Sequence, residues 1–222
     1  METKKQHVKT AKGRSASSTR WLQRQLNDPY VKKAQEQGFR GRAAFKLLQI
    51  NEKFHLLKPG QIVIDLGCAP GGWSQVATQL TKSSDKKPCV FGIDLLPTSP
   101  VAGAVFMQGD FSDPVFFENF QKILPDQKAD IILSDMAPNT SGIPSVDHLR
   151  LMNLLELAYD FACHHLKENG SFIAKIFQGG TDNELLNQIK LHFKTVKHFK
   201  PDASRKESVE YYIVAQGFKN ET

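Results

Sequence analysis

The sequence has no apolar run approaching the roughly 20 residues of a transmembrane helix, and no signal-peptide core follows Met1. It holds only 3 cysteines in 222 residues, at positions 68, 89 and 163. They show no CxxC spacing and no neighbouring His/Cys cluster, so we expect neither a disulfide framework nor a metal site. These absences favour a protein of a reducing compartment, which we expect to be cytoplasmic and without a membrane partner.

Acidic residues are scarce in the first part of the chain. Residues 1–60 hold 14 Lys and Arg against 4 Asp and Glu, whereas residues 61–222 hold 15 against 19. A basic front on a mildly acidic body favours a polyanionic partner that docks on the N-terminal region. Residues 1–19 lack apolar periodicity and are predicted to be a disordered basic tail. A mitochondrial transit peptide is the alternative interpretation of this tail, and Glu2 opposes it.

Residues 62–74 combine a short apolar run with a glycine-rich turn. Ile62 to Leu66 is rich in β-branched residues, which is typical of a buried parallel strand, and Trp73 to Leu80 has a helix-forming composition. A strand, a glycine turn and a helix form the opening unit of a nucleotide-binding α/β sheet. The ligand of such a unit lies at the carboxyl end of the first strand. For this stretch alone, a tight turn that needs only small residues is the alternative.

Strand and helix signals alternate through the rest of the chain, which predicts a doubly wound α/β fold. We expect about seven strands in a mostly parallel sheet with a terminal antiparallel strand. Residues 61–222 form this α/β body, and residues 20–60 are predicted to be a basic helical part of the same single domain. After the first strand, further strands are expected at 89–95, 105–107, 129–134, 171–177, 196–199 and 209–216.

Aspartates lie at the carboxyl ends of four predicted strands. Asp94 comes about 20 residues after the glycine turn, a spacing at which a carboxylate accepts both hydroxyls of an adenosine ribose. This spacing fits NAD as well as S-adenosylmethionine. Pro70 has no N–H to offer a pyrophosphate, and a ring of negative charge repels one but attracts an ammonium and a sulfonium. We therefore expect S-adenosylmethionine, although a turn or cap role is the alternative for each aspartate alone. The ring consists of Asp65, Asp94, Asp110 and Asp135.

Lys175 lies inside the predicted strand 171–177, although lysine is almost never buried without a partner. A strand-end lysine that reaches solvent is an equal alternative for this segment alone. Asp135 ends the neighbouring strand, Glu210 begins the last strand, and Lys46 belongs to the basic N-terminal helix. If these four side chains converge, they place two ammonium groups and two carboxylates in one cleft.

Two arginines lie near the start of the helix that carries Lys46. A cation beside a helix N-terminus is unfavourable by about 0.3–1 kcal/mol, because the helix dipole is positive there. Arg40 and Arg42 are therefore predicted to position RNA phosphates.

Six segments, taken in order, resemble the FtsJ/RlmE family of S-adenosylmethionine-dependent methyltransferases. Members of this family have a Rossmann-like class I methyltransferase fold and modify the ribose 2′-oxygen, and the bacterial members act on 23S rRNA. The resemblance runs from about residue 18 to residue 217. The segments are GFRGRAAFKL (38–47), DLGCAPGGWSQ (65–75), GIDLL (92–96), QGDF (108–111), LSDMAPN (133–139) and AKIF (174–177).

The resemblance implies that a uridine of large-subunit rRNA is methylated, in free rRNA or in the 50S particle, by a monomer. It implies a catalytic tetrad with Lys175 as the proton acceptor. It also implies that the methyl donor contacts a separate set of residues on the glycine turn and the strand ends. The tetrad is Lys46, Asp135, Lys175 and Glu210, and the donor set is Gly71, Trp73, Asp94, Asp110 and Asp135.

Three other functions are weighed against this one. A 2′-O-methyltransferase of tRNA or of an mRNA cap shares the same chemistry. A dinucleotide-dependent oxidoreductase is opposed by Pro70 and by the aspartate ring, and a non-catalytic ribosome-assembly factor is opposed by the tetrad. Within the methyltransferase, Lys175 can take the ribose proton only as a neutral amine. Steering of the hydroxyl by Lys175 while water takes the proton is the alternative role.

Overall fold

The computed structural model describes residues 7, 13–178 and 183–220. Within them the chain forms a seven-stranded sheet in the order β3-β2-β1-β4-β5-β7-β6. Strands β1 to β5 pair in parallel, and β7 is antiparallel to both β5 and β6. The predicted fold class is confirmed. The strands are β1 (Val63–Leu66), β2 (Val90–Asp94), β3 (Ala104–Gln108), β4 (Ala129–Ser134), β5 (Leu166–Phe177), β6 (Phe193–Phe199) and β7 (Glu210–Phe218).

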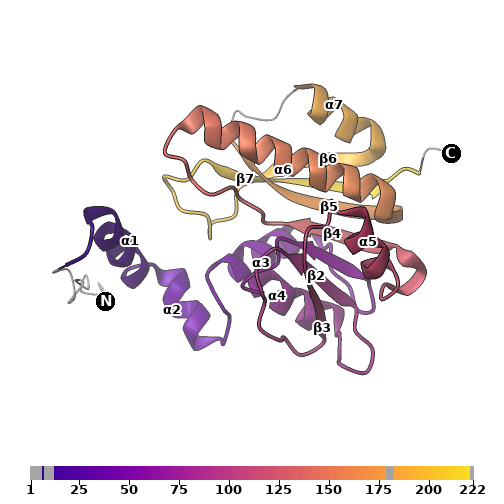
Figure 1. Cartoon of the computed structure of the whole chain (residues 1–222), viewed down its shortest axis with the longest axis horizontal. Coiled ribbons are helices and arrows are strands. Elements are labelled where there is room, and N and C mark those ends of the chain that lie inside the picture. Colours follow the sequence, from indigo (N-terminus) through magenta and orange to yellow (C-terminus); the bar gives the residue numbers. More distant parts are fainter. Residues whose placement is uncertain (1–6, 8–12, 179–182, 221–222) are drawn as a thin grey trace.

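Helices pack against both faces of the sheet (Figure 1). Side chains alternate along β1, so Val63 packs with one group of helices while Ile64 and Leu66 pack with the other. The first group is α3 (Ala43–Phe54) and α4 (Gly72–Thr81). The second is α5 (Pro114–Gln121), α6 (Pro144–His165) and α7 (Asn183–His192), and a short 3-10 turn at Pro125–Gln127 precedes β4. This alternation turns Asp65 toward the side of α4.

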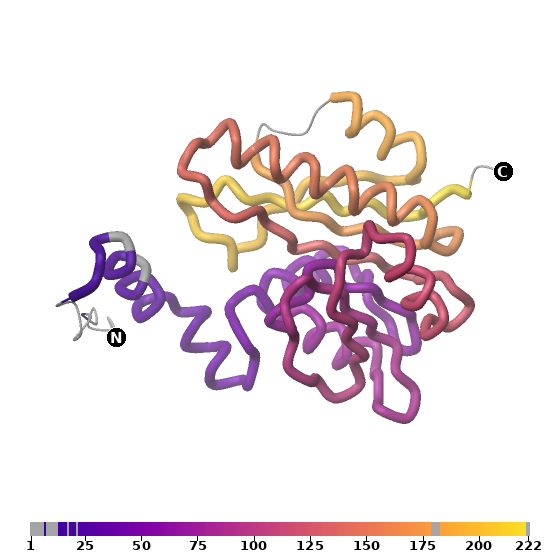
Figure 2. The backbone as a smooth tube through the Cα atoms, viewed as in Figure 1, coloured from indigo at the N-terminus to yellow at the C-terminus, as the bar shows by residue number. Residues whose placement is uncertain are grey.

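Two further helices, α1 (Ala16–Leu26) and α2 (Pro29–Glu36), extend to one side of the sheet (Figure 2). The Asp28 side chain accepts a hydrogen bond from Tyr30 N and caps α2, with Pro29 at the first helical position. Ala34 is buried with Phe45 of α3 and with Ala203, which fastens α2 to the body. Because α3 itself lies in the core beneath the sheet, the basic front is joined to the α/β body by packing.

Two predicted boundaries differ from the structure. Helix α1 begins at Ala16, capped by Ser15, inside the segment predicted to be a disordered tail; residues 1–6 and 8–12 of that segment lie outside the described residues. Strand β5 begins at Leu166, five residues before the predicted start of this strand at residue 171. Asn169 has a φ of 64° and the pairing register with β4 shifts nearby, so the early part of β5 contains a bulge. The glycine pair at 179–180 also predicts a turn, and these two residues lie outside the described part of the chain.

No helix in the described part of the chain has the length and apolar character that crossing a membrane requires.

Candidate active site

The glycine turn joins β1 to α4 and lets the backbone pass close to neighbouring groups. Gly67 has a φ of 70°, and a Cβ at this position would lie 2.3 Å from Met136 Cγ. Any other residue would therefore meet both backbone strain and a clash. The glycine at position 67 keeps the chain against the loop that follows β4, where Asp135 stands.

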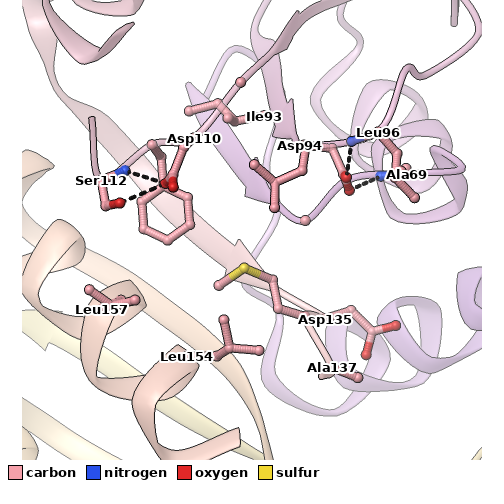
Figure 3. A pocket seen from close by; sticks show the side chains of 15 residues that line it. Ala69, Ile93, Asp94, Leu96, Asp110, Ser112, Asp135, Ala137, Leu154 and Leu157 are labelled. Atoms are coloured by element: carbon pink, nitrogen blue, oxygen red, sulfur yellow. Dashed lines mark hydrogen bonds between the residues drawn. The ribbon is translucent and has the colours of Figure 1, made fainter. Parts of the chain in front are cut away.

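A cavity of about 380 Å³ opens beside this turn, at the carboxyl ends of β1, β2 and β4 (Figure 3). Leu154 and Leu157 of α6 lie across the cavity from Asp94 and Asp110 (Figure 3). Ligands of open α/β sheets bind at this edge. Three of the predicted donor-site residues, Asp94, Asp110 and Asp135, line the cavity.

The Asp94 and Asp110 carboxylates are held by backbone N–H groups. Asp94 accepts hydrogen bonds from Ala69 N and Leu96 N, each 2.8 Å long. Asp110 Oδ1 accepts from both the backbone N and the hydroxyl of Ser112. A carboxylate has about four acceptor sites, so each keeps capacity for a ligand. A cavity with several acids and an apolar wall fits a cationic nucleoside such as S-adenosylmethionine.

Trp73 lies elsewhere than the donor-site prediction suggests. Its indole is buried against Tyr212, at 5.5 Å between ring centroids, and its Nε1 donates to Ala43 O at 2.9 Å. The side chain thus connects α4 to α3 and does not line the cavity. A contact between Trp73 and the donor stays a prediction, and the structure leaves only the Trp73 backbone, in the first turn of α4, available for it.

Asp65 is buried below the glycine turn, with 1% of its surface exposed. Its Oδ2 accepts a hydrogen bond of 2.6 Å from the Ser74 hydroxyl. Burial raises the pKa of Asp65 from 3.8 to about 7, and the charges of Asp135 and Asp94 add to this, against the hydrogen bond from Ser74. The structure therefore places a carboxyl group that titrates near neutral pH directly beneath the turn.

We expect Asp65→Asn to stabilise the protein in a pH-dependent way. A raised folded-state pKa means that the stability contributed by the neutral carboxyl is full below 3.8 and is lost as the pH rises through about 7. Between about pH 5 and about pH 8 the wild type should lose roughly 2–3 kcal/mol of unfolding free energy relative to the variant. Urea unfolding at both pH values measures this gap, and a gap that does not widen contradicts the prediction.

The four predicted tetrad side chains converge next to the cavity. Lys175 Nζ lies 2.8 Å from Asp135 Oδ1 and 3.8 Å from Glu210 Oε1. Lys46 Nζ lies 3.1 Å from Glu210 Oε2 and 3.9 Å from Asp135 Oδ1. Lys175 Nζ also donates to the main-chain O of Asp135 at 2.8 Å. Four distant segments of the chain thus form one compact cluster with balanced charges.

Burial and the neighbouring charges shift the pKa values of the two carboxylates of this cluster in opposite directions. Burial alone would raise the pKa of Asp135, but the Lys175 and Lys46 ammonium groups and the hydrogen bonds from Lys175 and Tyr212 hold it below its ordinary value. The same two ammonium groups also lower the pKa of Glu210 against its burial. Both carboxylates are therefore ionised at neutral pH and hold the lysines in position.

Tyr212 belongs to this cluster, although the sequence reasoning did not include it. Its hydroxyl donates to Asp135 Oδ1 at 2.5 Å, and Lys46 Nζ lies 5.7 Å from the centre of its ring. Burial and the nearby Asp135 and Glu210 charges raise the pKa of this hydroxyl well above its ordinary value, so it stays a donor. The sequence did hold a signal for this contact: Tyr212 follows Glu210 by two residues, so the two side chains lie on the same face of the strand.

Tyr212→Phe should lower the unfolding free energy by roughly 1.5–3 kcal/mol, the usual contribution of a hydrogen bond to a charged group. The ring remains to pack on Trp73, so the loss reports the hydroxyl alone. Tyr211→Phe is the matched control, because residue 211 points to the opposite face of β7. Urea unfolding checks the pair, and equal losses in both variants would count against a specific role for the Tyr212 hydroxyl.

A second cavity, of about 420 Å³, adjoins the other side of the tetrad. Lys46 and Glu210 belong to its wall, and half of the other lining residues are arginines. We call it the basic groove; it is lined by Arg24, Arg42, Ala43, Lys46, Arg205, Glu207, Ser208 and Glu210.

The two arginines predicted to contact phosphates make internal contacts. Arg40 donates to three backbone carbonyls, those of Pro70, Ser99 and Pro100. Arg42 Nη2 donates to Ala203 O at 2.5 Å, and its Nε lies 3.1 Å from Asp28 Oδ2 in an ion pair. Phosphate contact by either residue stays a prediction, and only Arg42 lines the basic groove.

Comparison with known proteins finds methyltransferases. The model of the FtsJ-like methyltransferase family matches residues 39–218. A ribosomal RNA large subunit methyltransferase E of Maricaulis maris is 56% identical in sequence, and the match covers 96% of this chain and 75% of the relative. The enzyme of the same name from Rickettsia akari is 55% identical, and that match covers 94% of this chain and 92% of the relative.

Solved structures agree with the fold. A crystal structure assigned as a ribosomal RNA methyltransferase of Plasmodium falciparum superposes with a TM-score of 0.70 at 33% identity, over 81% of this chain and 98% of that one. A fibrillarin/Nop5p complex has a TM-score of 0.53 at 19% identity and shares the fold alone. Because the family model spans most of the chain and the relatives cover nearly all of it, this chain belongs to the FtsJ-like methyltransferase family.

Proposed function

We propose that this protein transfers a methyl group from S-adenosylmethionine to the ribose 2′-oxygen of a uridine in large-subunit (23S) rRNA. The observation that carries the proposal is the position of the tetrad between two cavities. Asp135 lines the acidic cavity beside the glycine turn, while Lys46 and Glu210 line the basic groove. A cationic donor and a polyanionic acceptor would thus occupy separate sites on the two sides of the tetrad, in which Lys175 contacts Asp135 and Glu210.

S-adenosylmethionine supplies a methyl group that is already activated by its positive sulfur. Asp94 is suited to hold the ribose hydroxyls, because its oxygens lie at the end of β2 and are fixed by Ala69 N and Leu96 N. Asp110 is suited to accept from the adenine amino group. Gly71, with a φ of 101°, lets the turn bend into α4; it does not line the cavity, and its contact with the donor stays a prediction.

The tetrad handles the acceptor hydroxyl. A ribose hydroxyl is too weakly acidic to ionise beforehand, so a base has to take its proton as the oxygen attacks. In our proposal Lys175 Nζ, as a neutral amine, takes this proton and later releases it to water. Asp135 orients Lys175 through its carboxylate and its main-chain carbonyl, each 2.8 Å from Lys175 Nζ, while Lys46 and Glu210 position the ribose.

The relatives' names support ribosomal RNA as the substrate. Those of Maricaulis maris and Rickettsia akari are both called ribosomal RNA large subunit methyltransferase E, which favours rRNA over tRNA or an mRNA cap. The acids of the donor cavity and the missing N–H of Pro70 oppose a dinucleotide-dependent oxidoreductase. The monomeric state and the cytoplasmic location stay predictions.

Ribose-methylation mapping tests the proposal. Large-subunit particles and free 23S rRNA from cells that lack this protein are incubated with the purified protein and labelled S-adenosylmethionine, with tRNA and a capped RNA as comparison RNAs. We expect label at a single uridine 2′-oxygen, and the better of the two substrates identifies the assembly state that is recognised. Label on tRNA or on a capped RNA alone, or no label on any RNA, would overturn the assignment.

A further inference from the structure

We propose that Arg40 is a positioning residue for the methyl donor, acting through the backbone that forms the donor cavity. The proposal rests on the proposed function, because it assigns a role in binding S-adenosylmethionine. It differs from phosphate contact, in which the same guanidinium would face the RNA.

The Arg40 guanidinium joins two segments that are far apart in the sequence. Its Nη1 donates to Pro70 O at 2.8 Å and to Ser99 O at 2.6 Å, and its Nη2 donates to Pro100 O at 2.6 Å. Pro70 belongs to the glycine turn, and the other two belong to the loop between β2 and β3. All three acceptors are carbonyl oxygens, which a guanidinium satisfies without an anion.

The backbone around Arg40 is held to α4 by a second pair of bonds. Arg40 N donates to Gln75 Oε1 at 2.8 Å, and Gln75 Nε2 donates to Gly38 O at 3.0 Å. The arginine is therefore anchored at its backbone as well as at its guanidinium. This double anchoring fixes the long side chain before the donor binds, so donor binding does not have to order it.

The two segments that Arg40 joins form one wall of the donor cavity. Ala69 precedes Pro70, and Leu95 and Leu96 begin the loop that reaches Ser99; all three line the cavity, whereas Arg40 does not. Asp94 connects the same segments from within, because its carboxylate accepts from Ala69 N and Leu96 N. Arg40 joins the same two segments from outside the cavity, through its bonds to Pro70 O, Ser99 O and Pro100 O. It thereby fixes the position of Asp94 relative to the glycine turn.

The backbone at Gly71 is independent evidence that the guanidinium of Arg40 packs against the turn. A Cβ at position 71 would lie 2.6 Å from Arg40 Nη1, and the φ of 101° already disfavours other residues. The turn thus leaves room for the guanidinium on the face away from the cavity. Gly71, which the sequence predicts to contact the donor, also makes space for the Arg40 guanidinium that holds the turn in place.

Arginine suits this role better than lysine. A guanidinium has five N–H donors in a rigid planar fork, whereas an ammonium offers three donors from a single point. Three carbonyls from two segments match the fork. Charge alone does not reproduce the contacts, so Arg40→Lys separates this role from phosphate contact, which a lysine also provides.

The test compares Arg40→Lys and Arg40→Ala with the wild type by three measurements. Calorimetry gives the Kd for S-adenosylmethionine, filter binding gives the Kd for 23S rRNA at several salt concentrations, and steady-state kinetics gives KM and kcat. We expect both variants to bind S-adenosylmethionine roughly tenfold more weakly. We expect the rRNA Kd and its salt slope to stay unchanged, and kcat to recover at saturating donor.

Arg24→Ala is the matched control, because Arg24 lines the basic groove on the other side of the tetrad. It should weaken rRNA binding and flatten the salt slope while leaving the Kd for S-adenosylmethionine unchanged. Unchanged donor affinity in both Arg40 variants, a weaker rRNA Kd alone, or a general loss of cooperative unfolding in Arg40→Lys would each overturn the proposal. A wild type that binds no S-adenosylmethionine would instead overturn the proposed function.

Discussion

Lys175→Ala should lower the single-turnover rate of methylation by roughly 10²–10⁴-fold, the usual contribution of a general base. The donor cavity lacks Lys175 among its lining residues, so the Kd for S-adenosylmethionine should change little. Rapid-quench measurement with enzyme in excess over rRNA isolates the chemical step from product release. The variant also leaves Asp135 with Lys46 as its remaining cation, at 3.9 Å.

Two further variants distinguish a role of Lys175 as the base from a role in steering the hydroxyl. Lys175→Arg keeps the positive charge and its hydrogen-bonding capacity, but an arginine does not give up its proton in a protein. It should be as inactive as Lys175→Ala if Lys175 is the base, and largely active if Lys175 only steers the hydroxyl while water takes the proton. Lys197→Ala, which removes an exposed lysine from β6 of the same sheet, should retain the wild-type rate. Near-normal chemistry in Lys175→Ala would contradict the base assignment.

Asp135→Ala should be the most destabilising single change in the tetrad. Lys46 and Lys175 are 7% and 6% exposed, and without Asp135 they share Glu210 as their only carboxylate within the cluster of described residues. Removing one partner of a buried ion pair costs roughly 3–5 kcal/mol, because it leaves a buried charge uncompensated. The methylation rate should fall roughly 100-fold or more, since Lys175 loses the group that orients it.

The pH dependence shows whether charge causes this loss. The folded-state pKa of Asp135 lies below its ordinary value, so its contribution to stability is present above the unfolded-state pKa of about 4 and is lost as the pH falls through the folded-state value. Urea unfolding of the wild type and of Asp135→Asn should therefore differ most near neutral pH and converge in acid. Asp202→Asn, at an exposed position, serves as the control. A difference that persists in acid would point to packing instead of charge.

Much of the fold could be read from local patterns. Apolar runs that end in acids, glycines that follow the first strand and alternating helix signals are properties of short segments, and they predicted the doubly wound sheet that the structure has. The same patterns placed Asp94, Asp110 and Asp135 at strand ends, and these three line one cavity. The tetrad was expected to converge from the resemblance to a family, and its four members do meet.

Only the tertiary structure decided what each side chain faces. Asp65 was grouped with the other strand-end acids, but the alternation of β1 turns it into the protein beneath the turn, where burial raises its pKa to about 7. Tyr212 contacts Asp135 because β7 is inserted antiparallel beside β5, and this pairing joins segments that no local pattern connects.

Arg40 illustrates the same limit. Its sequence neighbourhood indicated a phosphate contact, whereas the fold brings three carbonyls from the glycine turn and the loop after β2 against its guanidinium. The sequence by itself determined the sheet, the donor turn and the kinds of chemical group available. The packing of distant segments decided which partner each group has, because hydrogen bonds and ion pairs depend on distances in space that residue order does not encode.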